Sequence, residues 1–139
     1  MPATTLCLNN ILNYNFGSSA YSETLPATMW IGLSTVVLTP ASTGATVTEP
    51  TAMGYARVSF TNNKTNWTTS TTASLENDVA IVFPESSGIW GEIVSIFIAD
   101  VTTVGAGNVW WYYNLNPTIT VGDNTTVTFP IASMLVSMT

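Results

Sequence analysis

The stretch FPESSGIWGEIVSIFIAD, residues 83–100, contains the pattern that decides the fold. Its first half is rich in proline, serine and glycine, which favour turns, and its second half is apolar at nearly every position. β-Branched and aromatic residues in such a run fit a pleated strand. Alternation places Val94, Ile96 and Ile98 on one face and Ser95, Phe97 and Ala99 on the other. We therefore predict a central strand that is covered on both sides.

The turn-rich half of this stretch contains Trp90 between Gly88 and Gly91. We expect these turns to hold Trp90 as a lid on one end of a β-sandwich. Glu85 and Glu92 flank the tryptophan, and paired carboxylates beside an aromatic are also found in sites that cleave glycosides. A buried Trp90 would indicate structure, whereas a Trp90 exposed in a cleft with both acids would indicate sugar chemistry.

The segments on either side predict further short elements. Residues 5–14 have helical spacing of leucine and isoleucine, with Thr4 or Thr5 as the N-cap. Residues 28–37 favour a strand, and residues 39–53 read as a long exposed loop. Residues 54–60, GYARVSF, alternate as a half-buried strand.

Over its whole length the sequence predicts seven or eight short strands, separated by residues that favour turns, and one small helix. The fold class that this pattern predicts is all-β, an antiparallel β-sandwich or jelly roll with one short N-terminal helix. The 139 residues suit one domain, 1–139, in which residues 1–28 form the helix and an arm.

Charge is scarce in this sequence. Only 7% of the residues are charged, against a usual share of about 25%, and the net charge is −6. Arg57 and Lys64 are the only cations, so the chain lacks the electrostatic basis for binding nucleic acid or an anionic membrane. So few charges cannot make a monomer's whole exterior ionic, and we expect a homo-oligomer or a docking surface.

Reactive groups are few as well. There is no histidine, and the single cysteine, Cys7, cannot form an internal disulfide. We expect no enzyme activity, no metal and no cofactor, because the chain has no histidine to act as the base that activates a nucleophile and no calcium-binding loop motif. Residues 1–10 resemble no signal peptide and no apolar run is long enough to span a membrane, so we expect synthesis in a cytoplasm.

The aromatic stretch NVWWYYNL, residues 108–115, predicts a strand with two aromatic faces. Alternation places Val109, Trp111 and Tyr113 on one face and Trp110, Tyr112 and Asn114 on the other. A second layer of the same domain, a neighbouring subunit or capsid protein, or a glycan would have to cover the second face. On the face of another strand, Arg57 lies beside Tyr55, and we expect it to pair with a carboxylate or stack on an aromatic. The candidate interface residues are thus Trp110, Trp111, Tyr112, Tyr113, Arg57, Tyr55 and Trp90.

Several segments taken in order resemble a family of small virion proteins of tailed bacteriophages. They are MWIGLST at 29–35, TGATVTEPTAMGYARV at 43–58, TNNKTNW at 61–67, FPESSGIWGEIVSIFIAD at 83–100 and VGDNTTVTF at 121–129. The resemblance covers most of the chain from residue 29 onward. It implies a structural component of the virion, of the tail-fibre or head-protein type, and it brings no catalytic residues.

Together these observations lead to a functional hypothesis. We expect a phage structural protein located in the virion, most concretely a capsid decoration (cement) protein that clamps the major capsid protein through multivalent contacts. The alternative is a tail-fibre or baseplate module that binds a partner protein or a host glycan.

Overall fold

The computed structural model describes residues 1–16, 26–51, 53–70 and 72–137, and these are almost entirely β-structure and loops. The elements are α1 (Thr5–Phe16), β1 (Thr28–Ser34), β2 (Val58–Thr61), β3 (Ser74–Glu76), β4 (Ile81–Val82), β5 (Gly91–Ala99), β6 (Val109–Val121), β7 (Thr128–Phe129) and β8 (Leu135–Ser137). Every strand pair is antiparallel. The all-β class with one short helix is therefore confirmed for the described residues.

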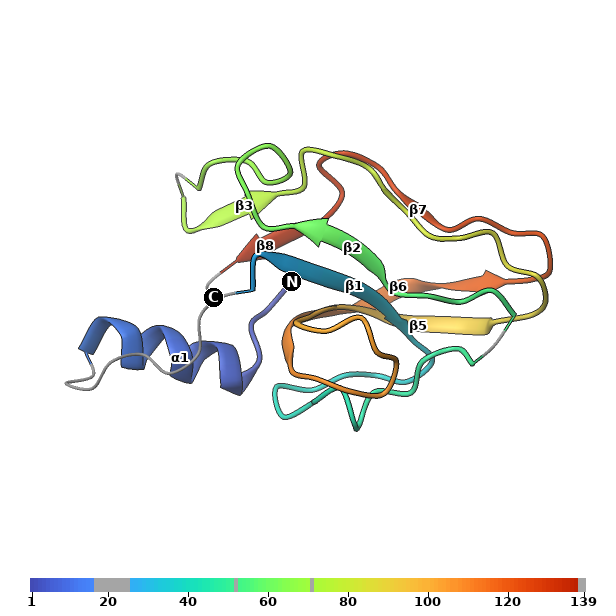
Figure 1. Ribbon diagram of the computed structural model, residues 1–139, viewed down its shortest axis with the longest axis horizontal. Helices are drawn as coiled ribbons and strands as arrows, with labels where there is room; N and C mark the ends of the chain where they lie inside the picture. Colours follow the sequence, from blue (N-terminus) through green and yellow to red (C-terminus); the bar gives the residue numbers. More distant parts are fainter. Residues whose placement is uncertain (17–25, 52, 71, 138–139) are drawn as a thin grey trace.

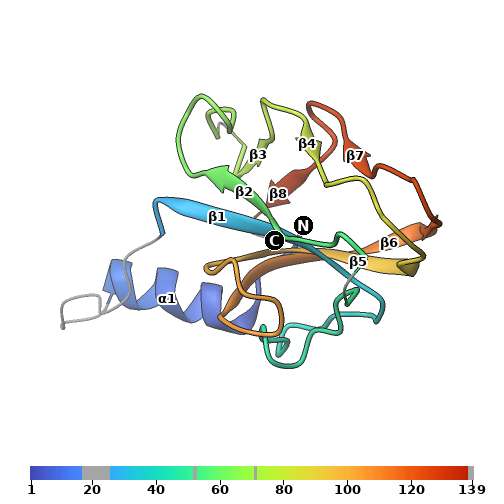
Figure 2. The ribbon, with the colours of Figure 1, turned by 45° about the vertical axis from the view of Figure 1, so that its right-hand side comes forward.

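The strands form one main sheet and two small pairs. The main sheet has the order β2-β1-β5-β6, and β3-β8 and β4-β7 are separate two-stranded sheets. Figures 1 and 2 show both small pairs above one face of the main sheet, while α1 and two long loops lie on the other side. The main hydrophobic cluster joins the layers, since it contains Ile31 of β1, Ile81 of β4 and Val136 of β8.

Strand β5, the second half of the opening stretch, is central as predicted. It pairs with β1 on one side and β6 on the other. Ile96 and Ile98 belong to the main cluster, and Phe97 and Ala99 belong to a second cluster on the opposite face. The predicted face of Val94 is wrong, because an irregularity between Ile93 and Ser95 shifts the register, and Ile93 is fully buried in the main cluster while Val94 is only half-buried.

The second cluster lies under the loop that follows β1. Leu38 and Val47 of this loop pack on Phe97, Val109 and Tyr112 of the main sheet. The loop prediction for residues 39–53 is correct in type, but the loop is not simply exposed, because Val47 and Glu49 are buried. The central strand β5 is thus covered on both faces within the chain.

The N-terminal residues connect the main sheet to the β3-β8 pair. The Tyr112 amide donates a hydrogen bond of 3.2 Å to the Pro2 carbonyl, and the Ser137 amide donates one of 3.3 Å to the Met1 carbonyl. Residues 1–4 therefore lie between β6 and β8. Helix α1 follows, and of the two predicted candidates Thr4 is its N-cap, since its Oγ1 accepts a hydrogen bond from the Cys7 amide at 3.3 Å.

The predicted strand over residues 54–60 is shorter in the structure. β2 begins only at Val58, and Gly54 has a positive φ of 78°. Tyr55 and Arg57 therefore precede the strand, and their side chains enter a buried hydrogen-bond network that is described next.

Candidate interaction site

A buried ion pair connects three segments of the chain at one end of the main sheet. The Arg57 guanidinium donates to Glu49, with Nη2 to Oε1 at 2.6 Å, and both side chains are 0% exposed. Its Nη1 donates to the carbonyls of Val101 at 2.8 Å and Ala106 at 3.1 Å. The expected pairing of Arg57 with a carboxylate is confirmed, and its guanidinium also lies 5.2 Å from the centroid of the Phe97 ring.

Tyr55 attaches the same network to β1. Its hydroxyl donates to Glu49 Oε2 at 2.8 Å and accepts a hydrogen bond from the Leu33 amide at 2.8 Å. Burial, together with the nearby Glu49 charge, raises the pKa of Tyr55 above its ordinary value. Because all of these partners belong to the same chain, Arg57 and Tyr55 order the loops, and any contact they make with another protein stays a prediction.

Trp90 lies in the interior at the end of the sheet where β5 begins. It is 5% exposed, and its Nε1 donates to the Met53 carbonyl at 2.8 Å. Its ring packs edge-on against Tyr55 with centroids 5.3 Å apart. Glu85 and Glu92 are exposed while Trp90 is buried, so this geometry corresponds to the structural role expected for a buried Trp90.

Gly91 and Gly88 shape the loop around Trp90. Gly91 has a φ of 86°, which a residue with a Cβ adopts only under strain, and a Cβ at Gly88 would meet Met53 Sδ at 2.5 Å. Ile89 at the tip of this loop is 75% exposed. The loop is therefore held in one conformation from within.

A β-bulge in β6 changes the predicted placement of the tryptophans. Ile98 pairs with Trp111 but Ala99 pairs with Val109, so Trp110 is the extra residue. Trp110 and Trp111 consequently stack on each other, with ring centroids 6.2 Å apart, instead of pointing to opposite faces. Val109 packs with Tyr112 in the second cluster, contrary to the predicted face.

After the bulge the predicted alternation of β6 is correct. Tyr112 is 8% exposed beneath the loop, and Asn114 on the same side accepts hydrogen bonds from the Leu38 amide and from Ser95 Oγ. Tyr113 points to the other side and is 46% exposed. Of the four aromatic residues predicted as an interface, Tyr113 is the one whose side chain is classed as exposed.

Helix α1 exposes an apolar stripe. Leu8, Leu12 and Phe16 follow one another at intervals of four residues and are 41%, 56% and 84% exposed. The opposite side contributes Cys7, which is 0% exposed, to the main cluster. Helix α1 contains no charged residue at all. The helix predicted over residues 5–14 is confirmed, and in the structure it continues to Phe16.

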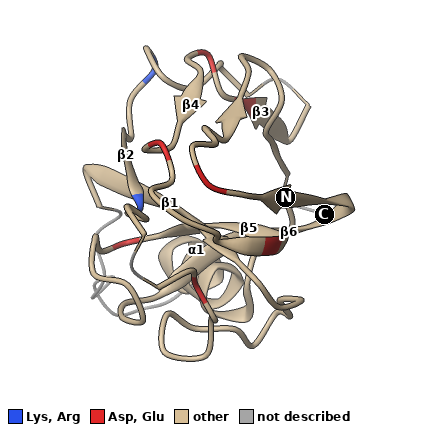
Figure 3. Cartoon of the chain, turned by 90° about the vertical axis from the view of Figure 1, so that its right-hand side faces the viewer, with Lys and Arg blue, Asp and Glu red and all other residues tan. Residues whose placement is uncertain are grey.

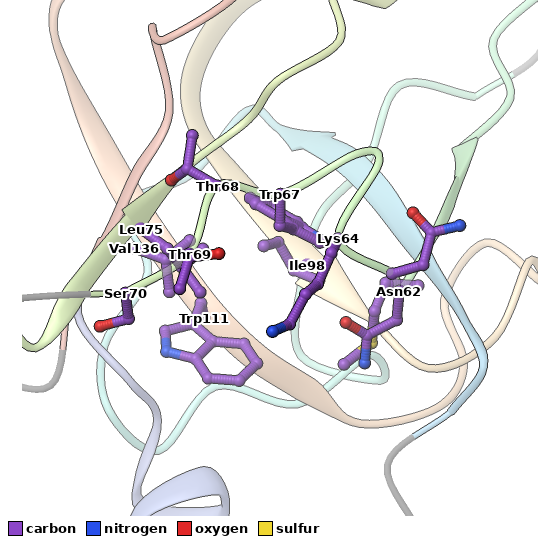
Figure 4. A pocket seen from close by; sticks show the side chains of 12 residues that line it. Asn62, Lys64, Trp67, Thr68, Thr69, Ser70, Leu75, Ile98, Trp111 and Val136 are labelled. Carbon is purple, nitrogen blue, oxygen red and sulfur yellow. The ribbon is translucent and has the colours of Figure 1, made fainter.

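A cavity of about 410 Å³ opens between the β3-β8 pair and the main sheet (Figure 4). Its apolar lining consists of Met29, Trp67, Leu75, Ile98, Trp111 and Val136. Its polar lining comes from one segment and consists of Asn62, Asn63, Lys64, Thr68, Thr69 and Ser70. In the described part of the chain, no group of histidine, cysteine or carboxylate side chains is arranged to hold a metal ion.

Comparison with known protein families shows which family the chain belongs to. The family model described as "Podophage GP4 fiber I protein gp80" matches residues 2–137. The chain belongs to this family. No curated protein matches it. Membership in the gp80 family confirms the expected phage virion structural protein, and the word "fiber" in the description favours the tail-fibre alternative over capsid decoration.

The gp80 family match also extends the resemblance drawn from the sequence, because it includes the N-terminal residues, α1 and the arm. Among the described residues of this family member, no helix has both the length and the apolar character needed to cross a bilayer. The family description places no residue in a site. The positions of Trp110, Trp111, Tyr112 and Tyr113 therefore come from the geometry alone.

Sequence reasoning did not find the α1 stripe or the cavity. The stripe had a signal, because leucine and phenylalanine at i, i+4 and i+8 mark one helical face. The cavity had no such signal, since its lining residues are spread along the sequence from Met29 to Val136 and meet only when β3 pairs with β8.

Proposed function

We propose that this protein is a structural subunit of a phage tail fibre, whose copies associate with one another and with neighbouring virion proteins through surfaces of low charge. The observation that supports this most strongly is the match of the fibre family to nearly the whole chain. The scarcity of charge, 7% of the residues, supports association as well.

The α1 stripe is the surface we assign to self-association. A second copy is the favoured occupant, because two molecules of net charge −6 repel each other least where neither carries a charge, and α1 carries none. A stripe of three apolar side chains on one helix is also self-complementary about a two-fold axis. Leu8, Leu12 and Phe16 of one copy would cover those of the other.

Sedimentation at several concentrations tests this contact. We expect the wild-type chain to form a larger species as concentration rises and Leu12→Glu to remain a monomer. Asn13→Glu is the matched control, because it adds the same charge to an exposed neighbour of the stripe and should leave association intact. A wild-type chain that stays monomeric at every concentration would refute self-association through α1.

Location in the particle tests the fibre assignment. Virions that carry a tagged copy should show the label on the tail. Label confined to heads would instead restore the capsid decoration hypothesis, with the major capsid protein as partner.

A further inference from the structure

The cavity between β3-β8 and the main sheet has the features of a ligand site. Pockets that bind small molecules have volumes of about 300–1,000 Å³ and combine an apolar lining with a few placed polar groups. This cavity has a volume of about 410 Å³ and is lined by both apolar and polar side chains. Five of the apolar ones come from β1, β3, β5, β6 and β8, while the sixth, Trp67, lies with the polar ones in the single segment 62–70.

The polar wall is held in place by its own hydrogen bonds. Asn63 Oδ1 accepts from the amides of Thr65 and Asn66, both at 3.0 Å, which fixes the turn that carries Lys64. The Asp78 amide donates to the Asn66 carbonyl at 2.7 Å, which ties the turn to the segment that follows β3. The cavity wall is thus formed before any ligand binds.

The charge of the cavity is unlike that of the rest of the molecule. Arg57 is buried against Glu49, so Lys64 is the exposed cation of the described residues, and no carboxylate lines the cavity. The acidic residues are scattered over the chain (Figure 3), and Glu76 and Asp78, whose backbone amides donate hydrogen bonds to Thr68 and Asn66, do not line the cavity. Figure 4 shows the Lys64 side chain extending over the cavity, with its ammonium group on the side of Trp111. Within a protein of net charge −6, this cavity is the place that an anionic group would prefer.

An orphan donor lies in the same wall. The Nε1 atoms of Trp110 and Trp111 are buried and have no hydrogen-bond acceptor among the described residues. Buried donors are almost always paired in folded proteins. Trp111 lines the cavity and stacks on Trp110, but its Nε1 atom is itself buried, so a ligand in the cavity would contact the indole ring and not this donor.

We propose that this cavity binds an acidic sugar unit of a polysaccharide. A pyranose ring has an apolar face of C–H groups and an edge of hydroxyls, which matches an apolar floor beside one polar wall. An acyl chain would cover the apolar residues but would leave the side chains of Asn62, Asn63 and Thr69 without hydrogen-bond partners from the ligand. The sugar carboxylate pairs with Lys64, its hydroxyls bond the amide and hydroxyl side chains of Asn62, Asn63 and Thr69, and its ring packs on Trp111.

Titration of the full-length chain with trigalacturonate, followed by NMR and by tryptophan fluorescence, tests this proposal. We expect saturable shifts confined to residues that line the cavity. Neutral galactotriose should bind about tenfold more weakly, and Lys64→Met should weaken trigalacturonate binding to a similar degree, because each removes a charge-assisted contact. Lys64→Arg keeps the charge and should retain most of the affinity.

Three results would overturn the proposal. They are an absence of shifts at the cavity with trigalacturonate, equal affinity for the acidic and neutral sugars, and saturation by octanoate in place of the sugars. The inference goes beyond the proposed fibre role and does not depend on it. Leu12→Glu, which is designed to block self-association, should bind trigalacturonate as the wild type does, so the two ideas can fail separately.

Discussion

Arg57 is the residue whose loss should affect the fold most widely. Its guanidinium joins Glu49 to the carbonyls of Val101 and Ala106, and the Arg57 and Glu49 side chains are fully buried. We expect Arg57→Met to lower the free energy of unfolding by about 3–5 kcal/mol, because it leaves the Glu49 carboxylate buried without its partner. Urea denaturation measures this. Arg57→Met combined with Glu49→Leu should recover part of the loss, and a double variant no better than the single one would contradict the explanation.

The two adjacent tryptophans should respond differently to truncation. Trp110 is 2% exposed, and Trp110→Ala should lower the free energy of unfolding by about 3–5 kcal/mol, as large core truncations do. Trp111 is only half-buried and lines the cavity, so Trp111→Ala should have a smaller effect on unfolding and a larger one on ligand binding. Equal, large losses of stability from both changes would show that Trp111 serves the core alone.

Two buried acids make the fold sensitive to alkaline pH. Burial raises the pKa of the Cys7 thiol to about 12 and raises the pKa of Tyr55 as well. In the unfolded chain the pKa of a cysteine thiol is about 8.5 and that of a tyrosine hydroxyl is about 10. Stability should therefore be complete below pH 8 and fall as pH rises, first through Cys7 and then through Tyr55, by at most about 1.4 kcal/mol per pH unit for each.

Urea denaturation between pH 7 and 11 measures this loss. Cys7→Ala should remove the part that begins near pH 8.5, and Tyr55→Phe should remove the part that begins above about pH 10. If the wild-type free energy of unfolding stayed constant over this interval, the thiol and the phenol would have to ionise equally in both states.

At the scale of single elements, the start of α1 offers a clean test of how the helix is anchored. Thr4 is 1% exposed, and its hydroxyl both caps α1 and donates to the Val109 carbonyl at 2.6 Å. Thr4→Ala should lower the free energy of unfolding by about 1–2 kcal/mol. Thr5→Ala, at an exposed neighbouring position, is the control and should change little. Equal effects would mean that Thr4 does not anchor the helix.

The elements also show how far the sequence can be read. The central position of β5 follows from its apolar alternation, and the start of α1 follows from Thr4, so both were predictable. The bulges near Ile93 and at Trp110 were not predictable from the sequence, because an extra residue does not change the pattern of a run that is apolar throughout. Each bulge nevertheless moves the side chains that precede it to the other face of the sheet.

The candidate site was less predictable for a different reason. Arg57 was singled out because cations are rare in this chain, but its partner Glu49 lies in a loop whose composition indicated exposure. The cavity depends on long-range pairing of β3 with β8, and no local pattern encodes that pairing.

For the whole molecule, sparse charge and the gp80 family match point to a building element in a larger assembly. The ion pair of Arg57 with Glu49 and the hydrogen bond of Trp90 to the Met53 carbonyl each hold the surrounding loops in a fixed conformation. Such rigidity lowers the entropy lost when copies associate.

Salt should separate the two kinds of contact that this molecule offers. Copies of net charge −6 repel each other, and the range of that repulsion falls from about 10 Å at 0.1 M to about 3 Å at 1 M ionic strength. Association through the uncharged α1 stripe should therefore strengthen as NaCl is raised, which sedimentation equilibrium measures as a smaller dissociation constant. Binding of trigalacturonate, which relies on the Lys64 charge, should weaken over the same series. Dissociation of the larger species by salt would show that charged contacts hold it together, and the α1 stripe could not then be its principal interface.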